Sequence, residues 1–305
     1  MIDDAQLAAI ARECRVQIIR MLTHAGSGHP GGSLSVIDLV TTLLLQRMRH
    51  DPQRPDWPDR DRLILSKGHA VPALYAAMAR AGYFPQDLLI TLRKLGSPLQ
   101  GHPDRTALPG IEAATGSLGQ GLSIAVGMAL GLRASGSPAR VYCIMGDGEI
   151  QEGQVWEAAM AAPELGQPDR PLDNLTVILD YNRIQLDDFV AKVRDIEPVS
   201  AKWKAFRWPV IEIDGHDVGQ IRKALDEAEA TRGVPTFIVA HTVKGKGVSF
   251  MENNPEWHGK SPKPSEAIEA IREILGVAEG AWDDYLKTDT ATRTFVAELH
   301  ALEKK

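Results

Sequence analysis

The chain has 305 residues, of which 44% are hydrophobic and 24% charged, as in an ordinary globular protein with a sizeable core. With 34 Lys and Arg against 40 Asp and Glu, its net charge of −6 disfavours a nucleic acid as partner. No run approaches the ~20 apolar residues of a membrane span, and the first 14 residues lack a basic and apolar leader, so we expect a cytoplasmic protein.

The N-terminal part is expected to contain two helices, a glycine-rich loop and a strand. Apolar residues recur at helical spacing over 4–21, and the sequence AGSG at 25–28 ends that helix in a Gly-rich loop. A second, largely buried helix is predicted for 35–47. Three prolines mark 51–61 as a surface connection, and the apolar run 62–66 predicts a short strand.

The middle of the chain alternates apolar runs with helical patterns. We expect strands, covered by helices on both faces, at 140–145, 175–179, 210–213 and 236–240. Helices are predicted at 155–162 and 218–230. This alternation indicates an α/β fold with a mainly parallel sheet, in which ligands collect at the carboxyl ends of the strands. The whole of 1–305 is expected to form one domain, with a core over about 10–260 and a helical C-terminal extension at 265–305.

Two strand ends carry residues suited to a metal-bridged pyrophosphate. The segment GDGEIQEG at 146–153 follows one apolar run, and its glycines allow backbone N–H groups to approach a phosphate closely. Asn182 follows the next apolar run, and it shares an edge with Asp147 if the two strands are neighbours. Their oxygens suit a hard cation such as Mg²⁺. Each motif alone is equally consistent with an ordinary turn or strand end.

Several segments, taken in order, resemble the transketolases. The Gly-Asp-Gly and later Asn are similar to the signature of thiamine-diphosphate enzymes, and a loop at 166–174 accounts for their slightly long spacing. The match to transketolases extends over most of 10–260 and includes SGHPG at 27–31, SKGHA at 66–70, GHP at 101–103, TGSLGQG at 115–121 and HG at 258–259. The resemblance implies the thiamine-diphosphate-binding fold.

The same resemblance implies a set of cofactor-binding residues. The metal, Mg²⁺ with Ca²⁺ or Mn²⁺ as alternatives, is expected on Asp147, Asn182 and the carbonyl of Ile184. The diphosphate is expected near Gly148 N–H and His69. Gly116 and Leu118 are expected to offer backbone contacts to the aminopyrimidine of thiamine diphosphate, Leu186 to press on the cofactor, and Glu152 to connect the site with a subunit interface. For Glu152 an ordinary salt bridge is an equal alternative.

Three histidines are expected to line the substrate channel by the same resemblance. His29, His102 and His258 would contact the hydroxyls of the donor sugar and the carbonyl oxygen of the acceptor. Imidazole suits this work because its unperturbed pKa allows proton exchange near neutral pH. For any one of them, a surface or hydrogen-bonded residue is the simpler interpretation. His24, His50, His241 and His300 carry no assignment, and His216 in DGHD at 214–217 is expected to cap a helix.

The resemblance covers only the first part of a complete transketolase. The pyrimidine-binding domain, with the glutamate that activates the cofactor, and a C-terminal domain are expected on a partner subunit, in an α2β2 heterotetramer. A truncated chain is the alternative. Sugar phosphates of the pentose phosphate pathway are the default substrates, and a specialised ketol-transferase or a deoxyxylulose-phosphate-synthase-like enzyme is the nearest alternative. A zinc hydrolase using the histidines and a non-catalytic homologue are the remaining ones.

Overall fold

The computed structural model describes residues 2–165 and 171–303, and a five-stranded sheet lies at its centre. All neighbouring strands are parallel, in the order β1-β2-β3-β5-β4. The strands are β1 (Arg62–Leu65), β2 (Val141–Gly146), β3 (Leu175–Tyr181), β4 (Val210–Asp214) and β5 (Thr236–His241). Each lies within two residues of a strand predicted from its apolar run, so the parallel α/β sheet is confirmed.

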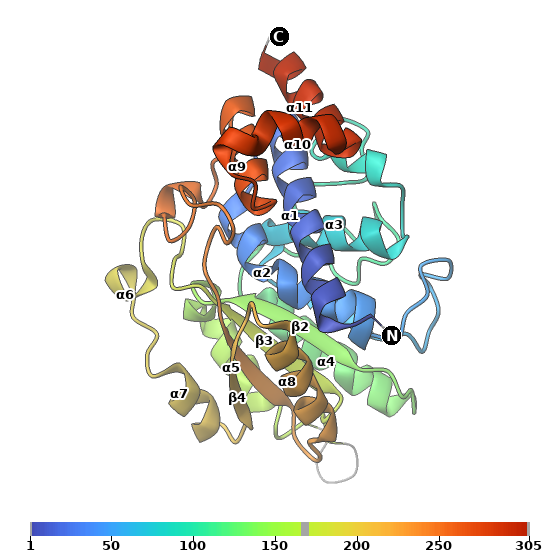
Figure 1. Cartoon of the computed structure of the whole chain (residues 1–305). Helices are drawn as coiled ribbons and strands as arrows, with labels where there is room; N and C mark the ends of the chain where they lie inside the picture. The colour runs from blue at the N-terminus through green and yellow to red at the C-terminus, as the bar shows by residue number, and fades with distance from the viewer. Residues whose placement is uncertain (1, 166–170, 304–305) are drawn as a thin grey trace.

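Helices precede, connect and follow the strands (Figure 1). Those before β2 are α1 (Asp4–Ala25), α2 (Pro30–Thr42), α3 (Val71–Ala81) and α4 (Gln120–Ala134). Those between β2 and β5 are α5 (Gly153–Ala161), α6 (Val190–Val193), α7 (Val199–Ala205) and α8 (Val218–Ala230). After β5 come α9 (Pro264–Ile274), α10 (Trp282–Thr288) and α11 (Thr290–Glu303), in the segment predicted to be a helical extension.

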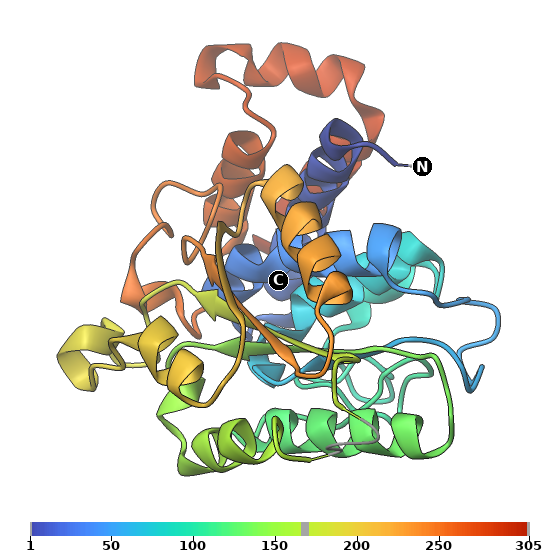
Figure 2. The same ribbon diagram turned by 90° about the horizontal axis from the view of Figure 1, so that it is seen from below.

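The helices form two layers, one on each face of the sheet (Figure 2). On one face α2 packs against α1, α3 and α8, and α1 packs against α9. On the other face α4 contacts α5, β2 and β3. Successive side chains of β2 enter the two cores in turn: Tyr142 and Ile144 join the first, and Cys143 and Met145 join the second. A strand buried on both faces must be apolar throughout, which explains its uninterrupted hydrophobic sequence.

The start of α2 differs from the prediction. The helix begins at Pro30 and not at residue 35, and a π-helical turn at Leu43–Arg47 follows its end. Gly31 therefore lies in the first turn of a helix and not in a loop. A Cβ at this position would lie 2.9 Å from Trp257 O and 3.0 Å from Lys244 Cγ. The glycine allows α2 to pack closely against the loop after β5, and that requirement is not visible in a local sequence pattern.

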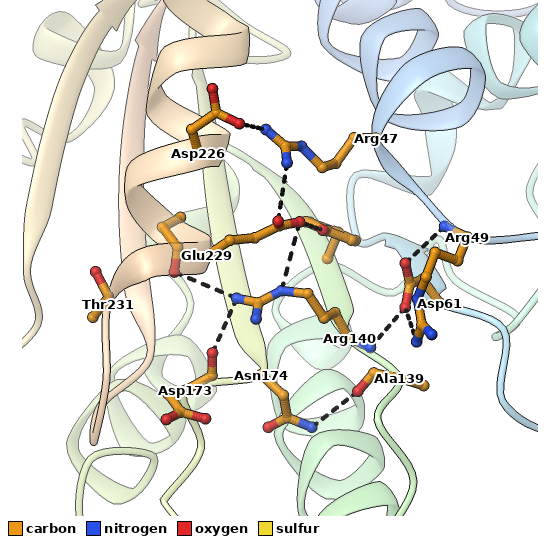
Figure 3. Close-up of polar contacts among 12 residues, drawn as sticks. Arg47, Arg49, Asp61, Ala139, Arg140, Asp173, Asn174, Asp226, Glu229 and Thr231 are labelled. Carbon is orange, nitrogen blue, oxygen red and sulfur yellow. Dashed lines mark hydrogen bonds and ion pairs between the residues drawn. The ribbon is translucent and has the colours of Figure 1, made fainter.

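Charged side chains connect the amino ends of the strands, opposite to the edge that carries the motifs (Figure 3). Glu229 of α8 accepts hydrogen bonds from Arg47 Nη1 (2.9 Å) and Tyr142 OH (3.0 Å). Arg140, just before β2, donates to the carbonyl of Asp173 (3.0 Å). The carboxylate of Glu229 thus joins α8 to the π-helical turn after α2 and to strand β2. We assign the amino edge of the sheet a structural role.

Two predicted segments remain: the loop at 166–174 and the C-terminal helical extension. The loop predicted at 166–174 lies largely outside the described residues, which resume at residue 171. The C-terminal helices are packed on the first helix of the chain, since Arg20 of α1 forms an ion pair with Glu298 of α11 (2.8 Å) and lies over the ring of Phe295 (4.1 Å). The segment after β5 is therefore attached to the first helical layer.

A pair of leucine substitutions tests the described core. Leu225 of α8 is fully buried in the first core, whereas Leu95 is fully exposed. We expect Leu225→Ala to lower the free energy of unfolding by about 2–5 kcal/mol, because it leaves a cavity. The matched change Leu95→Ala should alter it by less than ~0.5 kcal/mol. Urea denaturation measures both, and equal effects of the two variants would contradict the packing described.

Candidate functional site

The two motif-bearing loops meet at the carboxyl edge of the sheet. β2 and β3 are adjacent, with Gly146 opposite Asp180 in the register, so the loops that follow them begin side by side. Asp147 Oδ2 accepts a hydrogen bond from Arg183 N across the two loops, and Asp147 Oδ1 accepts one from Gly148 N (2.7 Å). The proximity of Asp147 and the loop of Asn182, which the sequence made conditional on neighbouring strands, is therefore observed.

A cavity of about 310 Å³ opens at this edge, and all twelve residues singled out from the sequence line it. They are His29, His69, His102, Gly116, Leu118, Asp147, Gly148, Glu152, Asn182, Ile184, Leu186 and His258. The lining also includes Lys67, Gly146, Glu149, Gln151, Gln185 and Lys244, to which the sequence interpretation assigned no role. The individual roles of the twelve stay predictions, but they occupy one site.

Oxygen atoms for a hard cation are present at one side of the cavity. Asp147 is 2% exposed, and burial together with the Asp180 carboxylate raises its pKa to about 6. Asn182 is 4% exposed, and its Oδ1 accepts a hydrogen bond from Ile184 N (3.1 Å). An amide oxygen has two lone pairs, so one bond leaves capacity for a ligand. A cation here would favour ionised Asp147 and lower its pKa.

Lys67 is one of the functional residues that the sequence interpretation missed. Its side chain is buried, and its ammonium forms an ion pair with Asp180 at the end of β3 and donates to Gly32 O (3.3 Å). Asp180 also accepts from Ser35 Oγ (2.6 Å) and from Thr242 Oγ1. Burial acts to raise the pKa of Asp180, but Lys67 and these donors outweigh it and hold the pKa below its usual range.

Lys244 is the second missed residue, and it follows β5. Its Nζ donates to Ile184 O (2.8 Å) and lies 2.7 Å from His258 Nδ1. Burial and the neighbouring Lys67 lower its pKa to about 7. An anion in the cavity would raise that pKa, because it stabilises the ammonium form. In the sequence it stands in VKGKG after an apolar strand, and that local pattern does not distinguish it from an ordinary surface lysine.

Four histidines from four segments form one wall of the cavity. The ring centroid of His29 lies 5.2 Å from that of His69, 5.4 Å from that of His258 and 6.3 Å from that of His102. Burial is the main cause that lowers the pKa of each, to about 4 for His29 and about 3 for His258. These imidazoles are therefore neutral at pH 7, and each can accept or donate a hydrogen bond.

The backbone of 115–119 forms another side of the cavity. Gly116 has φ +137°, and a Cβ there would lie 2.8 Å from His102 Cδ2. Thr115 Oγ1 donates to Leu65 O (2.7 Å), which fixes this segment to the end of β1. Leu118 and Gly116 thus present main-chain groups next to a histidine.

Two buried polar atoms of the lining, His29 Nδ1 and Gln185 Nε2, have no hydrogen-bond partner in the described part of the chain.

The capping role predicted for His216 is wrong. Asp217 caps α8, and its side chain accepts from Gln220 N (3.0 Å). His216 instead lies 2.7 Å from Asp38 of α2 through Nδ1, and its Nε2 accepts from Val243 N (2.9 Å). The imidazole therefore joins α2 to the loop that carries Lys244. Its partners are distant in sequence, so the motif alone favoured the local explanation.

The arrangement of the described side chains bears on the alternative of a zinc hydrolase, and the lengths of the described helices bear on a membrane span. Across residues 2–165 and 171–303, no three His, Cys, Asp or Glu side chains are arranged to hold a metal ion together, although four histidine rings converge. A zinc centre made of those side chains thus has no geometric basis in the described chain. Among the described helices, none has the length and apolar character needed to cross a membrane.

The family described as "Transketolase, thiamine diphosphate binding domain" matches residues 6–289. The chain belongs to the transketolase family. The resemblance inferred from the sequence motifs is thereby confirmed, and so is the thiamine diphosphate binding domain. The matched range is longer than the core of about 10–260 expected from the motifs, and it takes in α9 and α10.

Similar proteins include relatives named as transketolase subunits and relatives named as transketolases. The chain is 46% identical over 249 residues to the 6-deoxy-6-sulfo-D-fructose transketolase subunit SqwG of Clostridium sp. (strain MSTE9), covering 80% of this chain and 89% of that one. It is 38% identical over 272 residues to an apulose-4-phosphate transketolase subunit from Actinobacillus succinogenes, covering 89% and 96%. It is 41% identical over 277 residues to human transketolase, covering 89% of this chain and 43% of that one.

Solved transketolase structures share the fold. The transketolase from Leishmania mexicana superimposes with a TM-score of 0.81 at 31% sequence identity, over 97% of this chain and 47% of that one. The transketolase from Campylobacter jejuni gives a TM-score of 0.81 at 30% identity, over 98% and 48%. The chain thus spans about half the length of these solved transketolases, and nearly the whole length of the relatives named as subunits.

The buried histidines give a prediction for the folded chain without ligands. We expect the ring protons of His29 and His258 to show no titration between pH 7.5 and 5.5 in NMR spectra, since burial lowers their pKa to about 4 and about 3. In the unfolded chain both should titrate near ~6.5. His29→Gln and His258→Gln assign the signals, and a midpoint near pH 6.5 in the folded chain would contradict the burial described.

The lowered pKa values of His29 and His258 also make the free energy of unfolding depend on pH. Each folded pKa lies below its unfolded value, so the unfolded state binds more protons between the two pH values. These two histidines should therefore reduce stability as the pH falls from about 6.5 to about 4. Replacement of either by Gln should remove part of this decrease, as measured by urea denaturation at several pH values.

Proposed function

We propose that the chain is the N-terminal subunit of a thiamine-diphosphate-dependent transketolase, which transfers a two-carbon ketol unit from a ketose phosphate to an aldose phosphate. The observation that carries this proposal is the cavity itself. It combines oxygen ligands for a hard cation, two buried lysines and four neutral histidines at the carboxyl edge of a parallel sheet. Membership of the transketolase family implies that the cofactor is thiamine diphosphate. The residues of the cavity fit its diphosphate and metal ion.

The cation would be held by Asp147, Asn182 and the carbonyl of Ile184. These three oxygens lie on two adjacent loops, and a hard ion of octahedral geometry such as Mg²⁺ suits them together with phosphate oxygens. Ca²⁺ and Mn²⁺ are the alternatives. The Ile184 carbonyl already accepts from Lys244 Nζ (2.8 Å), and its second lone pair is available to the ion.

The diphosphate would be bound by Lys244, Lys67, His69 and the N–H of Gly148. The two lysines are buried, and Lys244 has a pKa lowered to about 7 by burial and by Lys67. A diphosphate brings negative charge that would restore the ammonium form of Lys244 and offset the cost of burying it. His69 is neutral because burial lowers its pKa well below the usual value, so it would act as a hydrogen-bond donor.

The remaining lining residues would orient the cofactor and the sugar. Gly116 and Leu118 offer main-chain groups to the aminopyrimidine, and Leu186, whose side chain is 64% exposed, would cover the cofactor with apolar surface. Glu152 lies exposed at the cavity, and we propose that it faces the subunit interface. The bound cofactor would supply the stabilisation of the carbanion, and the protein its position and electrostatics.

His29, His102 and His258 would handle the protons of the sugar. Their rings lie in one wall and are neutral, so each can accept a proton from a substrate hydroxyl and return it to a carbonyl oxygen. Neutral imidazole is required for the first of these steps, but burial that lowers the pKa of His258 to about 3 also makes it a weak base. The negative charge of a bound diphosphate would raise that pKa. The three rings would also bind the sugar hydroxyls through hydrogen bonds.

The activity would depend on a second polypeptide. Two relatives that this chain matches over most of their length carry the word subunit in their names, whereas the full-length transketolases are about twice as long. We propose that a partner chain supplies the pyrimidine-binding domain, with its activating glutamate, and the C-terminal domain, in an α2β2 complex. Substrates would be sugar phosphates, with the pentose phosphate pathway as the default.

A specialised ketol-transferase is the second candidate, and specific relatives favour it. The 46%-identical subunit is named for 6-deoxy-6-sulfo-D-fructose, and the 38%-identical one for apulose 4-phosphate. Each name thus specifies one particular sugar. The residues that read the far end of the donor would lie mainly on the partner, so the shared cavity is compatible with either substrate range.

Reconstitution with a partner tests the proposed activity. We expect co-expression with a chain carrying the pyrimidine-binding and C-terminal domains, plus thiamine diphosphate and Mg²⁺, to give ketol transfer with a turnover on the order of 1–10³ s⁻¹. Each chain alone should be inactive. Common ketose phosphates, apulose 4-phosphate and sulfofructose are compared as donors. An inactive pair, with both chains folded and the cofactor bound, would refute the assignment.

Removal of the proposed metal ligand tests the placement of the ion. We expect Asp147→Ala to weaken Mg²⁺-dependent binding of thiamine diphosphate by at least ~100-fold, since even an outer-shell change costs 10–100-fold in metal affinity. Asp147→Asn, which keeps a hydrogen-bond acceptor, should do nearly the same. The control Asp283→Ala changes an exposed residue of α10. Calorimetry measures affinity, and circular dichroism the fold; unchanged affinity would contradict the placement.

A further inference from the structure

One buried carboxylate, that of Glu149, accepts hydrogen bonds from two distant segments of the chain and from the start of its own loop. Glu149 lies two residues after Asp147 and is 2% exposed. Its Oε1 accepts from Ser66 Oγ and from Gly119 N (3.0 Å), and its Oε2 accepts from Gly146 N (3.0 Å). Every donor points to the carboxylate, which is the pattern of an ionised acceptor.

Each of the three donors is a direct neighbour of a cavity residue. Ser66 precedes Lys67, Gly119 follows Leu118, and Gly146 precedes Asp147. The segments are far apart in the chain, since Glu149 is 83 residues from Ser66 and 30 from Gly119. The carboxylate thus joins the segments proposed to bind the diphosphate, the aminopyrimidine and the metal ion.

We propose that Glu149 is a positioning residue that sets the relative placement of these three cofactor-binding segments through its hydrogen bonds. The inference rests on the proposed function only in naming the ligand that the segments bind. A bound ligand that contacts all three segments at once gains affinity when they are already placed, because the protein then loses less freedom on binding. The carboxylate provides that placement in the free chain.

An ionised carboxylate is required at this position, and an amide of the same shape cannot replace it. In Glu149→Gln, the amide oxygen can face either Gly119 N or Gly146 N. The amide NH₂ group then faces the other backbone N–H, and two donors cannot bond to each other. Whichever way the amide turns, one of these two N–H groups loses its partner, and a buried unpaired donor is unfavourable.

The segments have other contacts, so the change should not unfold the chain. Thr115 Oγ1 donates to Leu65 O (2.7 Å), which independently joins the segment before Gly119 to the end of β1. Gly146 is also the last residue of β2 and is paired with Asp180 of β3. The expected defect is therefore local to the loops.

The test compares Glu149→Gln with Glu227→Gln in the full chain. Glu227 is an exposed residue of α8, so the control makes the same chemical change away from the cavity. Two measurements are made: amide hydrogen exchange at Gly119 and Gly146, and the Kd of thiamine diphosphate with Mg²⁺ by calorimetry. We expect at least tenfold faster exchange at one of the two glycines and roughly tenfold weaker binding in Glu149→Gln, a loss of about 1.4 kcal/mol. The control should match the unmodified chain.

The outcomes separate positioning from a merely structural role and from the proposed function. A lower unfolding temperature with unchanged exchange and unchanged Kd of the folded chain would overturn the positioning role. If Glu149→Gln does not fold, Ser66→Ala decides, because it removes one donor and leaves both backbone bonds. We expect it to weaken binding at least threefold, and no change would overturn the proposal. Failure of the unmodified chain to bind thiamine diphosphate even with its partner present would refute the proposed function, while the exchange result still tests Glu149.

Discussion

The ion pair between Lys67 and Asp180 is the constraint on which the carboxyl edge of the sheet depends. An ammonium and a carboxylate removed from water need both each other and further hydrogen bonds. Ser35 of α2 and Thr242 after β5 supply those bonds, so satisfying one aspartate fixes a helix and two loops around it. A second lysine, Lys244, lies close by with a depressed pKa, because it is buried and lies near the ammonium of Lys67. The edge is built to receive an anion.

The helix α2 transmits this constraint to the rest of the first layer. Ser35 faces Asp180, and one turn later Asp38 faces His216 and Arg15, so one helix holds polar partners in the sheet, in the turn before α8 and in α1. The glycines at its start permit the close approach that these contacts need. The opposite, amino edge has its own charged network, centred on Glu229.

The sequence predicted the strands, their parallel arrangement and the twelve lining residues, because these follow from local patterns or from motifs in a recognisable order. It failed where partners are distant. Lys67 is 113 residues from Asp180, Lys244 is 60 from Ile184 and Glu149 is 83 from Ser66. No periodicity or propensity relates such pairs, and a lysine beside glycines is locally an ordinary surface residue. The start of α2 failed for a similar reason, since glycine there serves packing and not a turn.

The strand order has a consequence for how the chain acquires its site. β5 lies between β3 and β4, although it is the last strand made, so β4 has no edge to pair with until residues 236–241 arrive. Lys244 and His258 come later still. Contacts of such large sequence separation are formed only after long loops have closed, which makes them slow. During synthesis β3 therefore lacks its neighbour β5 until residues 236–241 are made, and the cavity is complete only after His258 has followed.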